Sequence, residues 1–178
     1  MLPQDPAAGF SQGSRSRSRI LIGVDDSEGS ARALGYVGNL LRDARDVQVT
    51  LFHVLKPMPR ELLEHGGSED PAEERRLAEA LRRDQEDWVR AETAIESPIL
   101  ANALELFGRT GFPLERVAVK SGCEDSVAHT ILDEARSGGY DTIVVSRHDS
   151  NGLNRLMHGS VTDQLLRAAA GFTLWVVE

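Results

Sequence analysis

Five short apolar runs alternate with longer helical patterns along this chain, and that alternation restricts the fold more than any other feature. The first run, residues 20–24, is almost entirely apolar and ends at two aspartates, Asp25 and Asp26. A strand that is apolar on both faces is typical of a parallel sheet covered by helices on each side. The pattern predicts an α/β sandwich, with five mostly parallel strands joined by right-handed helical crossovers.

The expected elements follow from periodicity and from helix start and stop signals. The strands are expected at residues 20–24, 47–55, 117–119, 142–145 and 172–177. The helices are expected after Ser27, from Pro71 to about residue 96, from Ser97-Pro98 to Gly108, and at residues 127–135 and 160–169. Ser27 is the expected N-cap of the first helix, with Ser30 as the alternative.

The chain divides into a tail, a domain and a charged insertion. Residues 1–18 are rich in Gly, Ser and Pro and predict a disordered tail, and residues 19–178 form the predicted domain. Residues 57–96 predict a variable, charged, helical insertion in which Leu77, Leu81, Trp88, Ala91 and Ile95 recur on one stripe. Two roles are open for this insertion, a lid over a ligand cleft or padding on the sheet.

Composition excludes several classes of protein. The 178 residues carry 20 Lys and Arg against 28 Asp and Glu, so the net charge of −8 favours neither nucleic acid nor an anionic membrane. The single cysteine, Cys123, excludes an internal disulfide and a cysteine-rich zinc site. The absence of a long apolar run and of a signal-peptide pattern predicts a cytoplasmic protein.

Polar residues follow two of the expected strands, where an open α/β sheet binds its ligand. Asp25 follows the first strand, and residues 146–149 follow the fourth. Gly159 and Ser160 then precede a helix, an arrangement that suits an anion but is on its own more typical of an ordinary N-cap. No nucleophile with an adjacent base accompanies Asp25, so we predict no catalysis beyond slow nucleotide hydrolysis.

Metal and redox chemistry are the weaker alternatives. His148 and His158 flank the same loop as Asp149, but no further ligand follows at a recognisable spacing, so no metal site is predicted. Cys123 is expected to be a small buried filler rather than a redox thiol. His53 is expected to be hydrogen-bonded within the sheet, and His129 to face solvent.

Two segments carry a resemblance to a known family. Residues 20–28 read ILIGVDDSE, and residues 144–163 read VVSRHDSNGLNRLMHGSVTD. The chain from residue 19 to residue 178 thereby resembles the universal stress proteins, whose corresponding segments typically read ILVPVDGSE and VVGSRGRSGLSRLLLGSVSE. The second match runs without a gap, and Gly122 fits the third strand-to-helix turn of that family.

The resemblance implies a Rossmann-like sheet with strand order 3-2-1-4-5, usually in a homodimer, and in some members an ATP or AMP site. By residue-for-residue transfer, Asp25 would meet the ribose or adenine, Val54 would line the adenine slot and Val145 would flank the base. The backbone amides of Ser160, which follows Gly159, and of Val161 would face the phosphates.

The chain departs from the nucleotide-binding motif at two of its three glycine positions, which hold Ser146 and Asp149. A carboxylate about 4 Å from a phosphate oxygen costs roughly 4 kcal/mol at an effective dielectric constant of 20. We therefore predict a non-catalytic stress-response protein that acts through an unidentified protein partner, has a degraded adenine-nucleotide site and needs no cofactor. The alternative is an ATP- or AMP-binding switch or slow ATPase of the same family, with magnesium bridging Asp149 to phosphate.

The last expected strand predicts a partner surface. Residues 172–177 are apolar at almost every position, and the expected strand order puts them at an edge of the sheet. An exposed apolar edge promotes aggregation unless something covers it. We expect a homodimer in which two copies pair through Phe172 to Val177 about a two-fold axis.

Overall fold

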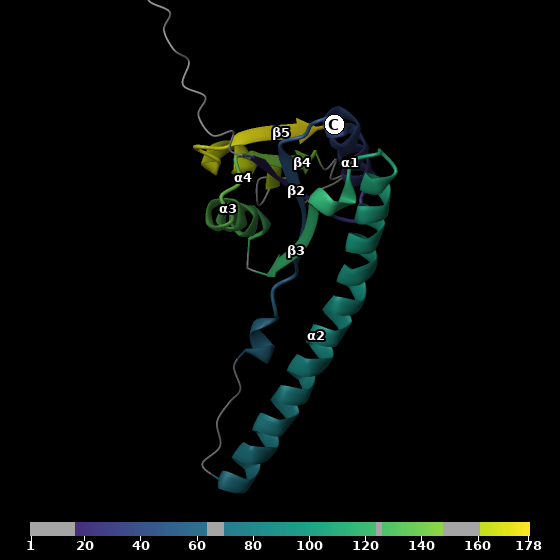
Figure 1. Ribbon diagram of the computed structural model, residues 1–178. Helices are drawn as coiled ribbons and strands as arrows, with labels where there is room; N and C mark the ends of the chain where they lie inside the picture. The colour runs from purple at the N-terminus through teal and green to yellow at the C-terminus, as the bar shows by residue number, and fades with distance from the viewer. Residues whose placement is uncertain (1–16, 64–69, 124–125, 148–160) are drawn as a thin grey trace, which may run out of the picture.

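The computed structural model describes residues 17–63, 70–123, 126–147 and 161–178, and those ranges form one sheet flanked by helices (Figure 1). The predicted tail falls almost wholly outside them, and β1 begins at Ser18. The strands are β1 (Ser18–Gly23), β2 (Val47–Leu55), β3 (Val117–Cys123), β4 (Thr142–Ser146) and β5 (Thr173–Val177). The helices are α1 (Glu28–Leu41), α2 (Pro71–Gly108), α3 (Val127–Ser137) and α4 (Val161–Ala168), with short 3-10 turns η1 (Arg60–Leu62) and η2 (Leu114–Arg116).

All strand pairs are parallel, and the strand order is β3-β2-β1-β4-β5. The predicted α/β class, the Rossmann-like three-layer architecture and the strand order are therefore confirmed. The sheet has β3 and β5 at its edges, and β1 lies between β2 and β4. Since the chain adds β2 and β3 on one side of β1 and then β4 and β5 on the other, the topology reverses between β1 and β4.

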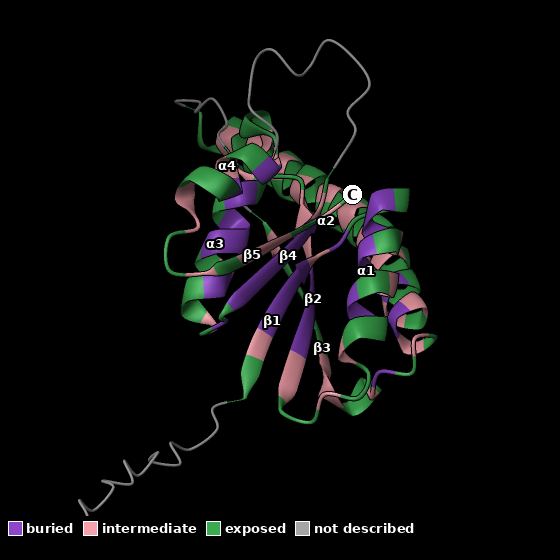
Figure 2. Cartoon of the chain, turned by 90° about the horizontal axis from the view of Figure 1, so that it is seen from above, coloured by how far each residue is buried: buried purple, intermediate pink, exposed green. Residues whose placement is uncertain are grey.

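Helices cover both faces of the sheet, and the central strands are buried between them (Figure 2). Two hydrophobic cores lie on the opposite faces, because successive side chains of a strand point to opposite sides. On β1, Ile20 and Ile22 face α1 and α2, whereas Leu21 faces α3 and α4. On β4, Val144 belongs to the first core and Ile143 to the second. The central strands are therefore apolar throughout because both of their faces are covered.

Helix α2 differs from the prediction, which divided this region into two helices at Ser97-Pro98. The structure has one helix of 38 residues with Pro98 inside it. Pro98 has no N–H to donate to the carbonyl four residues earlier, which removes one hydrogen bond of the helix. The segment after Pro98 is held in place by packing, since Ala103 and Phe107 are the buried residues of α2. Tertiary contacts thus override the local preference for a break.

Only the C-terminal part of α2 packs on the sheet. The α2 side chains that join or flank the hydrophobic core all lie between Leu100 and Phe107. Residues 71–96, which we call the arm, continue away from the sheet past β3 (Figure 1). At 1.5 Å per residue the arm is about 39 Å long. The segment 56–63, which we call the strap, follows β2 and lies along the arm, where Gln85 Nε2 donates to the Leu62 carbonyl at 2.6 Å.

Strand β3 is joined to α3 by polar and steric contacts. Lys120 Nζ donates to Glu134 Oε1 at 2.8 Å, and this hydrogen bond is the main reason that the pKa of Lys120 is raised. Gly122 lies where a Cβ atom would come within 2.7 Å of Phe52 Cζ and of Thr130 Cγ2. The missing side chain at residue 122 therefore lets α3 and β2 approach β3 closely.

Replacing Gly122 with alanine is expected to destabilise the fold by about 1–3 kcal/mol, because the new methyl group overpacks against Phe52 and Thr130. Urea unfolding followed by circular dichroism measures the change. The matched control is Gly35→Ala in α1, where a Cβ atom meets no other atom within 4 Å. That control is expected to stabilise the protein by about 0.5–1 kcal/mol through helix propensity. A loss at residue 35 as large as at residue 122 would contradict the steric explanation.

Candidate functional site

A cavity of about 350 Å³ opens at the carboxyl ends of β1, β2 and β4. It lies at the point where the strand order reverses, which is where open α/β sheets bind ligands. Its described lining comes from three strand ends and from the N-terminal parts of α3 and α4. The lining residues are Gly23, Val24, Asp25, Phe52, His53, Val54, Val127, Ile131, Val145, Ser146, Val161 and Thr162. The lining is mainly aliphatic, with a few polar groups at the strand ends.

The turn between β1 and α1 fixes the carboxylate of Asp25. Its Oδ1 atom accepts a hydrogen bond from the Ser27 backbone N–H at 2.9 Å and another from the Ser27 hydroxyl. Ser27 is also the N-cap of α1, because its Oγ accepts from the Ser30 backbone N–H at 3.1 Å. The prediction of Ser27 as the cap is confirmed, while Ser30 Oγ accepts instead from the Asp25 N–H. The same turn thus caps the helix and holds Asp25 at the mouth of the cavity.

The end of β2 contributes two adjacent residues, His53 and Val54. The Nδ1 atom of His53 lies 2.8 Å from the carbonyl oxygen of Val24, which accepts the Nδ1–H hydrogen. This confirms that His53 is hydrogen-bonded within the sheet. In the neutral imidazole the proton then resides on Nδ1, and Nε2 is an acceptor.

The end of β4 accommodates Ser146 in a space left by a glycine of α1. A Cβ atom on Gly29 would lie 3.2 Å from Ser146 Cβ and 3.3 Å from its Oγ, so the two residues are in close contact. Ser146 lies on the same side of β4 as Val144, which faces α1, whereas Val145 faces α3. The serine side chain is therefore directed mainly toward α1, where Gly29 makes room for it.

Arg147, the first residue after β4, is bound to the C-terminal end of the chain. Its backbone N–H donates to the Val177 carbonyl at 2.8 Å, and its Nη1 lies 2.6 Å from Glu178 Oε1. Both members of this ion pair are more than half exposed, so it contributes little to stability. The contact does place the Arg147 guanidinium at the β5 edge, beside Glu178.

Five of the eight predicted site residues meet around the cavity: Asp25, Val54, Val145, Ser146 and Val161. The other three, Asp149, Gly159 and Ser160, lie outside the described residues, as do His148 and His158. Whether these residues bind a nucleotide stays a prediction.

Sequence reasoning missed several residues that line the cavity, among them His53, Ile131 and Thr162. The signal for His53 was available, since it directly precedes Val54 at the end of β2. Ile131 and Thr162 were predicted only as parts of the helices at residues 127–135 and 160–169, and nothing in their spacing distinguishes a cavity wall from a core.

One prediction near the site is wrong. Cys123 is exposed rather than buried, because it is the last residue of an edge strand, and its Sγ lies 3.3 Å from the Lys56 carbonyl oxygen. His129 is exposed, as expected. Within the described ranges, His, Cys, Asp and Glu side chains form no group of three that could hold a metal ion.

The sheet order, the helices on both faces and the cavity at the topological reversal define a Rossmann-like α/β protein with a cavity at its strand ends. A family model described as the universal stress protein family matches residues 16–176. The chain therefore belongs to the universal stress protein family. No curated protein matches the chain significantly.

Solved structures share the fold at low sequence identity. The universal stress protein UspA from Lactobacillus plantarum has a TM-score of 0.60 and 21% identity, over 93% of this chain and all of that one. A universal stress protein in complex with cAMP has a TM-score of 0.59 and 13% identity, over 92% of this chain and 98% of that one. The universal stress protein from Archaeoglobus fulgidus in complex with dAMP has a TM-score of 0.55 and 16% identity, over 92% of this chain and 99% of that one.

None of the helices that the structure describes has the length and apolar character needed to cross a membrane.

Proposed function

We propose that this chain is a non-catalytic stress-response protein whose cavity takes adenosine or an adenosine monophosphate and discriminates against ATP. The observation that carries the proposal is the convergence of aliphatic walls and one anchored carboxylate on a single cavity. Val54, Val145 and Val161 supply the apolar walls that a purine ring requires, and Asp25 supplies a polar group at the mouth. Bound cAMP and dAMP in two proteins of the same fold support the choice of a monophosphate.

Asp25 is suited to hold a ribose. Its Oδ1 atom is already used by Ser27, which fixes the orientation of the carboxylate. The second oxygen, Oδ2, is then the acceptor that a ribose hydroxyl would meet. A carboxylate held in this way loses little conformational entropy when the ligand binds, which favours affinity.

The phosphate end of the site accounts for the discrimination against ATP. Asp149 follows Ser146 by three residues and stands where the family's nucleotide-binding motif has glycine. Its negative charge opposes a triphosphate much more than it opposes a single phosphate or an uncharged nucleoside. Arg147 compensates little in this proposal, because it is paired with Glu178 at the β5 edge.

The described hydroxyl–carboxylate contact at the cavity, Ser27 with Asp25, is assigned a structural role in this proposal, because Ser27 Oγ also accepts from the Ser30 backbone N–H as the cap of α1. Covalent catalysis requires a nucleophile in hydrogen-bond contact with a base. His53 is the one imidazole in the described lining, and its Nδ1 is committed to the Val24 carbonyl. The proposed role is therefore ligand-dependent regulation of a partner protein rather than turnover.

Isothermal titration of the full chain with adenosine, AMP, cAMP and ATP, with and without Mg²⁺, tests the proposal. AMP is expected to bind at least about a hundredfold more tightly than ATP, since about 3 kcal/mol separates a monophosphate from a triphosphate beside the carboxylate. Val54→Trp, which fills the cavity, is expected to abolish binding, whereas Leu166→Trp on the exposed surface of α4 is not. Tight binding of ATP would favour the alternative, an ATP-dependent switch or slow ATPase.

We also propose that the protein is a homodimer paired through β5. The strand lies at the sheet edge, and Val176 is 37% exposed beside Tyr36 and Leu40 of α1, which are 57% and 56% exposed. These residues line an open groove together with Trp175, Val177 and Glu178. A second copy would cover both the unpaired strand edge and this apolar groove.

Val176→Glu is expected to weaken this dimer by at least about a hundredfold, because like charges meet close to the two-fold axis. Sedimentation velocity over a range of protein concentrations measures the change in mass. Leu166→Glu is the control, since Leu166 is 63% exposed and lies on α4 rather than at the β5 edge. A mass that Val176→Glu leaves unchanged at every concentration would exclude pairing through β5.

A further inference from the structure

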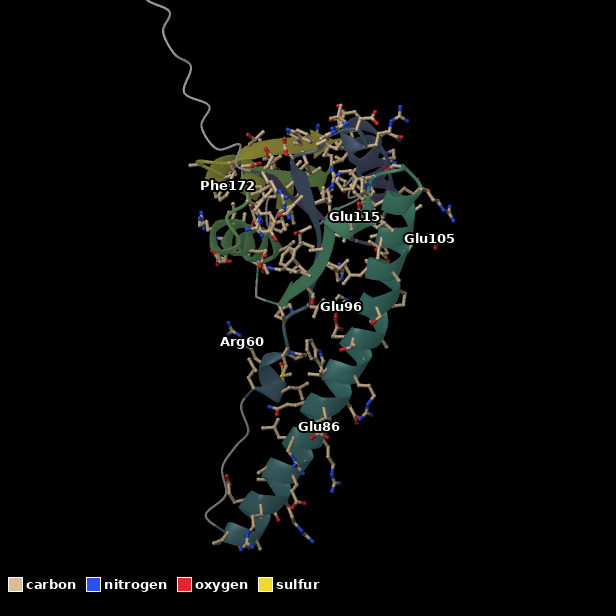
Figure 3. All side chains as sticks on the ribbon, viewed as in Figure 1. Arg60, Glu86, Glu96, Glu105, Glu115 and Phe172 are labelled. Atoms are coloured by element: carbon tan, nitrogen blue, oxygen red, sulfur yellow. The ribbon has the colours of Figure 1, made fainter. Side chains whose placement is uncertain are left out.

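The arm, residues 71–96 of α2, has no buried residue in the single chain. Isolated helices are marginally stable in water, and a helix of this kind normally owes its stability to tertiary packing on an apolar face. The strap contacts the arm on one side, through the hydrogen bond from Gln85 to the Leu62 carbonyl. Among the residues that the structure describes, little else covers the arm, and many of its side chains extend away from the rest of the protein (Figure 3).

The arm nevertheless carries an apolar stripe. Leu77, Leu81, Trp88, Ala91 and Ile95 are separated by four, seven, three and four residues, which is the spacing of a coiled-coil seam with one polar residue, Asp84, at the seam position between Leu81 and Trp88. Leu77, Leu81 and Trp88 are half-buried. Ala91 is exposed and Ile95 is 55% exposed, and we call this part of the stripe its open edge.

Charge identifies what could cover the open edge. Residues 71–83 contain four arginines and three glutamates, whereas residues 84–96 contain five carboxylates and one arginine. The outer half of the arm is thus slightly basic and the inner half strongly acidic. Two arms aligned in parallel would place acid against acid, whereas an antiparallel alignment places each basic half against an acidic half.

We propose that the arm is a second self-association surface, through which two copies of this chain pair with their arms antiparallel. Leu77, Trp88 and Ile95 form the seam, and the small side chain of Ala91 allows the helices to approach closely. Such a pairing has two-fold symmetry, since the same patch serves both copies. It is independent of the proposed ligand and of the proposed β5 interface, and together the two surfaces would link four copies or more.

Sedimentation of the full chain tests the proposal with two matched variants of α2. Ile95→Glu places a carboxylate in the seam and is expected to weaken arm pairing by at least about tenfold. Val89 is 50% exposed, similar to Ile95, but lies off the stripe. Val89→Glu adds the same charge there and is expected to have little effect on arm pairing. If β5 also pairs, the unchanged protein forms an assembly of four or more copies. Ile95→Glu then leaves the dimer that is paired through β5, and Val176→Glu leaves the dimer that is paired through the arms.

The two interfaces fail in distinguishable ways. If the protein is a dimer that Val176→Glu dissociates and Ile95→Glu leaves intact, the arm proposal is wrong and the β5 proposal is supported. A dimer with the opposite sensitivity supports the arm and overturns β5. A monomer, whether its arm is solvated or binds some other protein, overturns self-pairing altogether.

Spin labels test the antiparallel orientation in the Cys123→Ser background. A label at residue 84, near the middle of the arm, is expected to lie close to its counterpart in the second copy. A label at residue 76 is expected to be offset from its own counterpart by about 24 Å along the helix axis, and so to lie clearly farther from it, since eight residues of helix separate it from the middle on each copy. Equal distances for the two labels would indicate a parallel arrangement and overturn the proposed geometry.

Discussion

Asp149→Gly is expected to raise the affinity of this protein for ATP by up to about a thousandfold. Two unit charges about 4 Å apart interact by roughly 4 kcal/mol at an effective dielectric constant of 20, and each 1.4 kcal/mol is a factor of ten in affinity. The substitution also restores the glycine that the nucleotide-binding motif has three residues after Ser146. Glycine removes a Cβ atom and permits the backbone to approach phosphate closely.

Two variants separate the charge at residue 149 from other effects. Asp43→Gly makes the same replacement after α1, at the amino end of the sheet, and is expected to leave ATP binding unchanged. Ser146→Gly is expected to have only a small effect, because the serine side chain packs against Gly29 on the α1 side. Calorimetric titration with ATP and AMP compares the variants. An unchanged ATP affinity in Asp149→Gly would mean that this carboxylate does not oppose the phosphates.

Much of the fold could be predicted from the sequence because the central strands are constrained on both faces. Val47–Leu55 was predicted with the bounds that the structure has, since its apolar centre is flanked by clear turn signals. The strand order came from the family resemblance rather than from periodicity. β3 was predicted too short, because its C-terminal half is an exposed edge with Lys120 and Ser121 in place of apolar residues.

The course of α2 could not be predicted, because local and tertiary preferences conflict there. Pro98 is a strong local signal for a break, but packing around Phe107 keeps the helix continuous. The apolar stripe of the arm was correctly recognised, yet a stripe of this kind is normally a core face. Only the structure shows that the arm leaves the sheet.

The residues of the candidate site could be predicted where they lie at the end of a strand, but not where they lie on a helix. Asp25, Val54 and Val145 lie at strand ends, which a parallel sheet brings to one edge. Ile131 and Thr162 reach the same cavity from the N-terminal parts of α3 and α4. Their position depends on how those helices pack on the sheet, which no local pattern encodes.

Phe107→Ala is expected to be the most destabilising single truncation in α2, lowering the free energy of unfolding by about 3–5 kcal/mol. Phe107 is completely buried, and its ring centroid lies 5.2 Å from that of Phe112. Its carbonyl accepts the Thr110 hydroxyl at 2.6 Å, and Thr110 packs where Gly38 of α1 has no side chain. The Phe107 ring belongs to the core that α1, α2 and Phe112 share, so its truncation leaves a cavity at the base of the arm, whereas the backbone contact with Thr110 is retained.

Urea unfolding followed by tryptophan fluorescence measures this loss and identifies what unfolds. Trp88 reports on the arm and Trp175 on β5, so Trp88→Phe restricts the signal to the sheet. Val89→Ala, at a half-exposed position of the same helix, is the control and is expected to change stability by less than about 0.5 kcal/mol. Because α2 meets the core only through residues 100–107, both fluorescence signals should shift together in Phe107→Ala. A shift confined to Trp88 would instead mean that the arm unfolds separately and that Phe107 anchors the arm without supporting the sheet.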